Sequence, residues 1–180
     1  MQTVVTADQL QAWWQELNAR FFDNCLPPIM IHWSQRLTSS SGMFVSELGP
    51  RAIFLDSAQT FLHHRAIRLS IPLLARQAAS ETLNTLAHEM IHQWQFDLRK
   101  RRPNHGRDFR RMMAAMNQHG LNITVRHALN DAEALSKYMW HCVNCGRVYR
   151  RYRRSIRPNR HRCGVCAGRL KELPLATVSG

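Results

Sequence analysis

Five consecutive residues, His88-Glu89-Met90-Ile91-His92, carry the strongest chemical signal in this sequence. On an α-helix, side chains four positions apart lie on the same face, so both histidines could bind one metal ion. Glu89 would then lie beside that ion, where its carboxylate could take a proton from a metal-bound water. The spacing therefore predicts a hydrolytic zinc site with Glu89 as general base; the alternative is a buried helix whose histidines only form hydrogen bonds.

A third ligand is required, because catalytic zinc normally has three protein ligands and one open position for water. His105 is favoured, since it follows His92 by thirteen positions and is expected to begin the next helix. Asp108 is the alternative, although it could instead cap that helix or orient His105. Bound zinc lowers the pKa of its water toward roughly 7 and polarises a substrate carbonyl, so the predicted reaction is peptide-bond hydrolysis.

A second metal site is indicated by four of the five cysteines, which form two CxxC pairs separated by seventeen residues: Cys142, Cys145, Cys163 and Cys166. Four thiolates complete a tetrahedral zinc site that is structural and has no position for substrate. Free buried thiols, the alternative, would not explain the pairing. We therefore expect two zinc ions per chain, one catalytic and one structural, and a reducing compartment.

The whole chain has a formal net charge of +13, and its positive charge is concentrated in the second part. Residues 1–98 contain six basic and eight acidic residues, whereas residues 99–180 contain nineteen and four. Most of the basic residues are arginines, whose planar forks match phosphate geometry and stack on bases. This balance points to a nucleic acid partner.

Aromatic residues are interleaved with the arginines around the cysteine pairs. A cationic groove with stacking rings is typical of proteins that bind single-stranded nucleic acid. A solvated arginine surface is the alternative, but the eight arginines between the pairs have no compensating acid and would repel one another. The expected contact residues are Arg99, Arg101, Arg102, Tyr138, Trp140, Arg147, Tyr149, Arg150, Arg151, Tyr152, Arg153, Arg154 and Arg157.

The elements that must position these residues follow from hydrophobic periodicity. Helical spacing predicts three helices. The first covers residues 7–22 and is capped by Thr6, and the second covers residues 80–98 and contains both histidines. The third covers residues 105–119 and is closed by Gly120. Short β-type runs predict strands at residues 29–33, 52–55, 66–71, 122–127 and 147–152, and residues 38–42 read as a loop. The expected fold class is α+β, with helices packed on a small sheet followed by a small β zinc ribbon.

The composition changes after residues 131–137, which we expect to be the junction between a protease domain, residues 1–130, and a ribbon subdomain, residues 131–180. No run of 18 apolar residues is present, and the first residues lack the features of a secretory signal. We expect an intracellular monomer without membrane attachment, in the cytoplasm or nucleoid if bacterial and in the nucleus if eukaryotic.

Several segments together resemble the SprT/Spartan metalloproteases, from about residue 7 to residue 173: TLAHEMIHQW, NHGRDF, LNITVRHALND, YMWHCVNC and HRCGVCAGRL. The most specific part is HEMIH with the HGxxF that follows. The resemblance implies a zincin-like core, His88, His92 and His105 as zinc ligands, Glu89 as the catalytic residue, and a zinc-binding subdomain that contacts DNA. It also implies DNA-activated degradation of proteins crosslinked to DNA, which is DNA–protein crosslink repair, and self-cleavage.

One departure is that the chain ends soon after the ribbon, without the long tails of eukaryotic Spartan, and its compactness is closer to bacterial SprT-like proteins. Two other functions are compatible with the residues. One is a non-catalytic zinc-ribbon protein that binds DNA or takes part in transcription, and the other is a general intracellular zinc peptidase.

Overall fold

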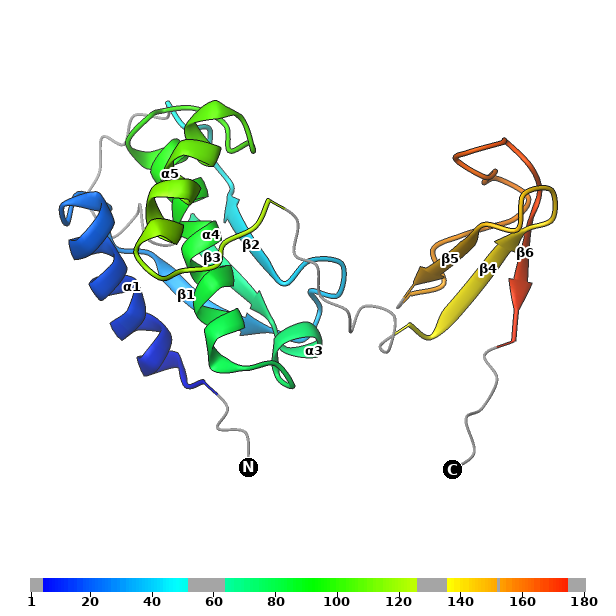
Figure 1. Cartoon of the computed structure of the whole chain (residues 1–180), viewed down its shortest axis with the longest axis horizontal. Coiled ribbons are helices and arrows are strands. Elements are labelled where there is room, and N and C mark those ends of the chain that lie inside the picture. Colours follow the sequence, from blue (N-terminus) through cyan, green and yellow to red (C-terminus); the bar gives the residue numbers. More distant parts are fainter. Residues whose placement is uncertain (1–4, 52–63, 126–135, 152, 175–180) are drawn as a thin grey trace. The chain divides into compact units, whose positions relative to one another are not determined.

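The computed structural model describes residues 5–51, 64–125, 136–151 and 153–174 (Figure 1). The chain forms two compact units, Met1–Ala128 and Leu129–Gly180. The predicted strand at residues 52–55, the predicted junction around residue 130 and Tyr152 lie outside the described residues. The α+β class predicted from the sequence is confirmed, and no described helix is long and apolar enough to cross a membrane.

The first unit contains a three-stranded sheet in the order β1-β3-β2. Strand β1 (Met30–Ser34) runs parallel to β3 (Arg65–Ser70), and β2 (Gly42–Ser46) runs antiparallel to β3 on its other side. The central strand is buried over its whole length except at Arg68. Because β2 is last in the order β1-β3-β2, it is an edge strand of the described sheet. Every second residue of β2 has its backbone N–H and C=O groups directed away from β3.

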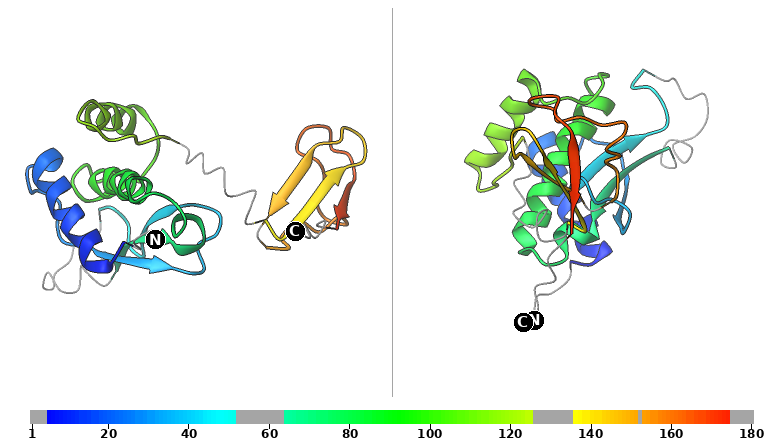
Figure 2. Two further views of the ribbon diagram at one scale, coloured as in Figure 1. Left: turned by 60° about the horizontal axis from the view of Figure 1, so that its bottom comes forward. Right: turned by 90° about the vertical axis from the view of Figure 1, so that its right-hand side faces the viewer.

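Helix α4 (Ala79–Asp97) lies between this sheet and α5 (Arg107–Gln118), as the left view of Figure 2 shows. Helix α1 (Ala7–Phe22) packs against α4 and β1, and the short α3 (Ile71–Leu74) follows β3 directly. Thr6 caps α1, as predicted, by accepting a hydrogen bond from the backbone N–H of Gln9. One hydrophobic core joins these elements, and it includes Leu10, Trp14, Ile67, Leu69, Leu86, Met90 and Ile91.

Buried polar contacts fix the C-terminal half of α4. Gln93 accepts a 2.9 Å hydrogen bond from the indole of Trp14 and donates a 2.8 Å hydrogen bond to the carbonyl oxygen of Pro27. Asp97 forms a buried ion pair with Arg65 of β3. These side-chain partners satisfy polar groups that would otherwise be costly to bury, and they set the position of the helix relative to α1 and the sheet.

The second unit is a three-stranded antiparallel sheet in the order β5-β4-β6. It consists of β4 (Tyr138–Cys142), β5 (Val148–Arg151) and β6 (Leu170–Leu173). Its small core contains Trp140, Ile156 and Leu170 together with two of the cysteines, Cys142 and Cys163. With so few apolar residues, this unit depends on further cross-links for its stability.

Three details of the sequence prediction were wrong. Residues 42–46 form β2, although only a loop was expected in this region. Among the described residues 121–125 there is no strand, because the side-chain amides of Asn84 and Asn117 bind the backbone of Asn122 and Ile123. Helix α5 begins at Arg107 and not at residue 105, so His105 lies in the preceding loop.

Candidate metal centre and hydrolytic site

Three histidines converge at one point of the first unit. The Nε2 atom of His105 lies 3.0 Å from Nε2 of His88 and 3.1 Å from Nε2 of His92. Helix α4 presents His88 and His92 one turn apart, and both are buried, whereas His105 comes from the exposed loop before α5. The three residues identified from spacing are therefore close enough to share one metal ion.

The hydrogen-bond partners of the Nδ1 atoms determine which tautomer His88 and His92 adopt. His88 Nδ1 faces the carbonyl oxygen of Thr124 at 2.9 Å, and His92 Nδ1 faces Oε1 of Gln95 at 3.2 Å. Both oxygens can only accept, so each Nδ1 carries the proton and each Nε2 is left with a lone pair. Lone pairs that face one another favour a bound cation.

The spacing of the Nε2 atoms fits zinc. Zinc–nitrogen bonds of 2.0–2.1 Å place the ligands of a tetrahedral site about 3.3 to 3.4 Å apart, close to the separations observed here. Burial, and then the charge of Arg110, lower the pKa of His105 and favour its neutral, metal-binding form. Asp108, the alternative ligand, is outside this group of three and pairs with Arg101 at 3.3 Å.

The apolar ring of Phe109, on α5, packs against all three imidazoles. Its fully buried ring has centroid distances of 4.7 Å to His88, 4.9 Å to His92 and 4.7 Å to His105. The sequence analysis included Phe109 only as the last residue of the HGxxF motif and gave it no role in the site. Its position four residues after His105 is the signal that connects it to the site, because the loop ends at Gly106 and the helix then begins at once.

Glu89, the residue directly after His88 on α4, is buried, and the backbone N–H of Phe44 donates a 2.6 Å hydrogen bond to its Oε2 atom. Burial raises the pKa of Glu89 to about 8, and the Phe44 hydrogen bond opposes that shift. A cation held by the neighbouring histidines would favour the carboxylate form and lower this pKa. The helix thus carries a buried proton acceptor on the residue that follows one of the metal-binding histidines.

Gly42 allows β2 to approach α4 closely enough for this contact, and sequence reasoning missed its role. A Cβ atom at this position would lie 2.7 Å from Cγ2 of Thr85 and 2.8 Å from Cγ of Glu89. Real Cβ atoms do not approach other atoms so closely, so only glycine fits without movement of the strand or the helix. The signal in the sequence is faint, since one glycine after a serine run reads as part of a turn.

The second unit brings its four cysteines together, as their spacing predicted. The Sγ atoms of Cys142 and Cys166 are 3.4 Å apart, those of Cys145 and Cys163 are 3.6 Å apart, and all four lie within 4.8 Å of one another. Tetrahedral zinc with Zn–S bonds of 2.3 Å would separate its ligands by about 3.8 Å, so this group fits a closed zinc site.

Tyr149 supports this thiolate group. Its hydroxyl accepts a 3.0 Å hydrogen bond from the backbone N–H of Gly164 and lies 3.1 Å from Sγ of Cys163. Because the Tyr149 oxygen already accepts from Gly164, its own proton is directed at the sulfur. That hydrogen bond is the largest of the causes that lower the pKa of Cys163 to about 6, and it favours the thiolate that binds metal.

Of the three described aromatic residues expected to stack on bases, one is buried and two are half-buried. Trp140 is completely buried in the core, so the strand alternation of β4 removes it from the surface that was predicted to bind nucleic acid. Tyr138 and Tyr149 are half-buried, and the ring of Tyr138 stacks against Trp140 at a centroid distance of 6.0 Å. The described arginines of this surface are all exposed: Arg147, Arg150, Arg151, Arg153, Arg154 and Arg157.

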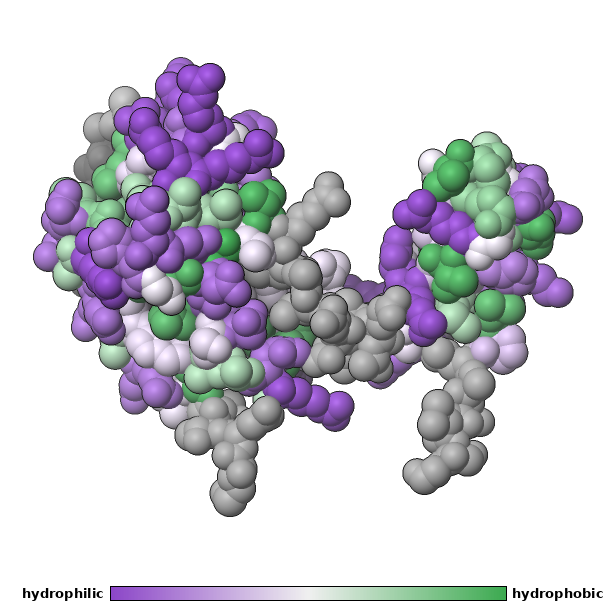
Figure 3. Space-filling view, viewed as in Figure 1, coloured by the Kyte–Doolittle hydropathy of each residue, from purple (hydrophilic) through white to green (hydrophobic). Residues whose placement is uncertain are grey.

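A second basic surface lies in the same unit as the histidines. Seven of the thirteen residues from 99 to 111 are Lys or Arg, and all seven are exposed. Figure 3 shows hydrophilic side chains gathered where α4 ends and α5 begins. This set includes the predicted contacts Arg99, Arg101 and Arg102, and the chain between them and α5 carries His105.

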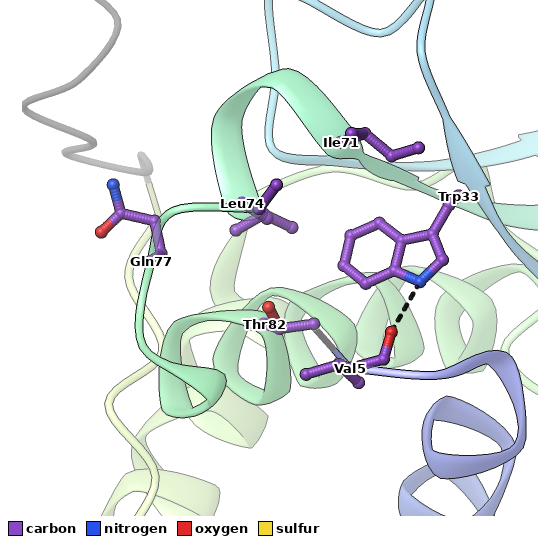
Figure 4. Close-up of a pocket in the computed structure, with 7 residues that line it drawn as sticks. Val5, Trp33, Ile71, Leu74, Gln77 and Thr82 are labelled. Atoms are coloured by element: carbon purple, nitrogen blue, oxygen red, sulfur yellow. Dashed lines mark hydrogen bonds between the residues drawn. The ribbon is translucent and has the colours of Figure 1, made fainter. Parts of the chain in front are cut away.

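An apolar cavity of about 200 Å³ lies near the N-terminal end of α4 (Figure 4). Trp33 forms one wall, and its indole donates a 3.0 Å hydrogen bond to the carbonyl oxygen of Val5. None of the residues that line the cavity is a histidine, a cysteine or a carboxylate, so it is separate from the hydrolytic site.

Two family models match the chain. The SprT-like family matches residues 10–127, and the SprT-like zinc ribbon domain matches residues 136–173. The resemblance predicted from the motifs is therefore confirmed.

Individual relatives agree with this match. The DNA-dependent metalloprotease dvc-1 of Caenorhabditis elegans is 34% identical over 128 residues, covering 69% of this chain and 32% of its own length. The DNA-dependent metalloprotease SPRTN of Homo sapiens is 33% identical over 137 residues, covering 74% of this chain and 26% of its own. Protein SprT-like of Bacillus subtilis is 27% identical over 146 residues, covering 77% of this chain and 95% of its own. The chain thus spans a third or less of the two relatives named as metalloproteases.

Proposed function

Because this chain belongs to the SprT-like family, we propose that it is a DNA-dependent zinc endopeptidase that cleaves proteins crosslinked to DNA. One observation supports this function above all others, namely the convergence of three imidazole Nε2 atoms, two of them from the helix that also carries the buried carboxylate of Glu89. The relatives named as DNA-dependent metalloproteases support the same class of activity.

In this proposal His88, His92 and His105 hold the catalytic zinc. When bound, the ion supplies a Lewis acid that activates water and polarises the scissile carbonyl. Glu89 accepts the proton of the attacking water and passes it to the leaving amine. The Phe44 N–H binds Oε2 of Glu89, which fixes the carboxylate and leaves Oε1 to carry the proton.

The second zinc ion in the proposal is structural. Cys142, Cys145, Cys163 and Cys166 hold it with four thiolates, and these leave no position for substrate. The ion would cross-link β4 to the loops of a unit whose own hydrophobic core is small.

DNA is the proposed partner and activator. The exposed arginines of the second unit and the basic residues 99–111 would neutralise phosphates, and single-stranded character would suit the half-buried tyrosines. DNA held by these residues would bring an attached protein, or a second copy of this chain, to the metal centre. Self-cleavage would follow from the same proximity.

The test uses a protein that can bind DNA as the substrate, supplied free of DNA, with and without added single-stranded DNA. Cleavage is expected only with DNA, and equal cleavage in both reactions would reject DNA dependence and favour a general zinc peptidase. The Glu89→Gln variant should retain two zinc ions and lose cleavage. Zinc-loaded wild-type protein that binds DNA but cleaves nothing would instead indicate a non-catalytic DNA-binding protein.

A further inference from the structure

Gln95, in the last turn of α4, connects two parts of the metal centre. Its side chain is buried, and its Oε1 atom faces two donors, the Nδ1 atom of His92 at 3.2 Å and the backbone N–H of Asn104 at 3.0 Å. A backbone N–H can only donate, so the atom that faces Asn104 must be the amide oxygen. The same oxygen then requires the proton of His92 on Nδ1, which leaves Nε2 free for a metal.

Asn104 continues this connection to the third histidine. Its Oδ1 atom accepts a 2.8 Å hydrogen bond from the backbone N–H of Gly106, so the two residues on either side of His105 are joined. The backbone carbonyl oxygen of Gln95 also accepts a hydrogen bond from Arg101 N–H at 3.0 Å. Gln95 therefore holds the loop that carries His105 at two points and fixes the ring of His92 at a third.

We propose that Gln95 is a positioning residue of the metal centre, which sets the tautomer of His92 and holds His105 within reach of the same ion. The proposal rests on the zinc site of the proposed function. His105 belongs to no helix or strand, so without this anchor the metal itself would have to order the loop, at a cost in conformational entropy. Loss of the acceptor would also allow His92 to adopt the tautomer whose Nε2 carries a proton and cannot bind metal.

Gln93 provides a matched control on the same helix. It is a completely buried glutamine two residues earlier, and its amide binds Trp14 and Pro27. Among the described residues, no hydrogen bond joins its side chain to the three histidines or to the 99–106 loop. Substitution of Gln93 should therefore cost stability without a specific effect on the metal centre.

The experiment measures zinc affinity in the full chain by competition with a chelator. Zinc at the cysteines is counted separately by its release on thiol modification. Gln95→Leu should weaken the histidine site about 10- to 100-fold, as is typical when a partner of a metal-binding histidine is lost. Gln95→Glu keeps an acceptor for both donors, so its zinc affinity should be within a few-fold of the wild-type value. Gln93→Leu should lower the thermal midpoint and leave zinc affinity unchanged.

Unchanged zinc affinity in Gln95→Leu would overturn the proposal. Equal weakening in Gln93→Leu would do the same, because it would assign the effect to general destabilisation, and so would weakening in Gln95→Glu as large as in Gln95→Leu. The measurement requires no cleavage. A wild-type chain that binds zinc at the histidines but never cleaves would contradict the proposed function and leave the role of Gln95 intact.

Discussion

The backbone N–H of Phe44 binds the carboxylate of Glu89 across 2.6 Å, although the two residues are 45 positions apart. This hydrogen bond links an edge strand to the helix of the histidine pair. It depends on the absence of a side chain at Gly42, where β2 passes close to Thr85 and Glu89. The orientation of the proposed general base is thus set by a strand that carries no catalytic side chain.

Gly42→Ala should separate catalysis from metal binding. The added methyl group would push β2 away from α4 and displace Glu89, and a misplacement of about 1 Å can cost on the order of 100-fold in rate. We expect kcat to fall by about that factor, with zinc content and KM little changed. Gly49→Ala is the control, because a Cβ atom there meets no atom within 4 Å. Equal losses in both variants would contradict this explanation.

Glu89→Gln should change how the stability of the zinc-free protein depends on pH. The folded state raises the pKa of Glu89 from 4.5 to about 8, so it binds that proton more tightly than the unfolded chain does. Stability from this group is therefore lost as pH rises through that interval. The variant should be more stable than wild type at pH 8, by on the order of a few kcal/mol, and similar to it near pH 4. Denaturant unfolding with a chelator, at several pH values, tests this; parallel pH dependence in the two proteins would exclude it.

The two metal sites should lose zinc independently. His88→Ala should remove one of two zinc ions and leave the ribbon folded, because the ligands of the two sites belong to different compact units. Cys142→Ser should remove the other ion and unfold the small second unit while the first keeps its zinc. Metal analysis of each variant, with circular dichroism, is the measurement. Loss of both ions in His88→Ala would show that the sites are coupled.

Tyr149→Phe should raise the pKa of Cys163 toward its ordinary value of 9, since the hydroxyl that favours the thiolate is removed. Zinc uptake by the ribbon requires thiolates, so its midpoint should move to higher pH in the variant. Tyr138→Phe, on the adjacent strand β4, is the control, because the Tyr138 hydroxyl is not among the groups that shift the pKa of Cys163. An unchanged midpoint in Tyr149→Phe would show that the hydroxyl does not assist metal binding.

Arginines of the second unit should differ in their effect on DNA binding. Arg154 and Arg157 are both exposed and were both predicted to contact nucleic acid, but Arg154 already binds Glu172 at 2.9 Å. Arg157→Ala should reduce the slope of log affinity against log salt by about 1, as expected for one phosphate contact. Arg154→Ala should reduce it less, because Glu172 already neutralises part of that charge. Equal slopes in wild type and Arg157→Ala would remove Arg157 from the interface.

The sequence was sufficient where a single local pattern decides the structure. The apolar period of α4 brings His88 and His92 together, and the cysteine spacing brings four thiols together, so both groups could be predicted from the residues alone. His105 was identified by its separation from His92, although the helix that was expected to carry it starts two residues later. Asn104 and Gly106 hold that residue in a loop, which helix periodicity does not reveal.

Tertiary contacts decided the features that were missed. Ile123 has strong β propensity, yet the amides of Asn84 and Asn117 occupy the backbone of its segment in place of a neighbouring strand. Trp140 lies among basic and aromatic residues, but the alternation of β4 turns it into the core. Gly42 and Gln95 gain their roles only from residues brought close by folding, and a single sequence does not display such pairs.

The exposed thiol of Cys25 can serve as a chemical probe of the ribbon's metal content. Cys25 follows α1 with an exposed thiol and is outside the group of four cysteines. Bound zinc would shield the other sulfurs, so an alkylating reagent should modify one position in the loaded chain and up to five after demetallation. Labelling stoichiometry therefore becomes a readout of ribbon occupancy.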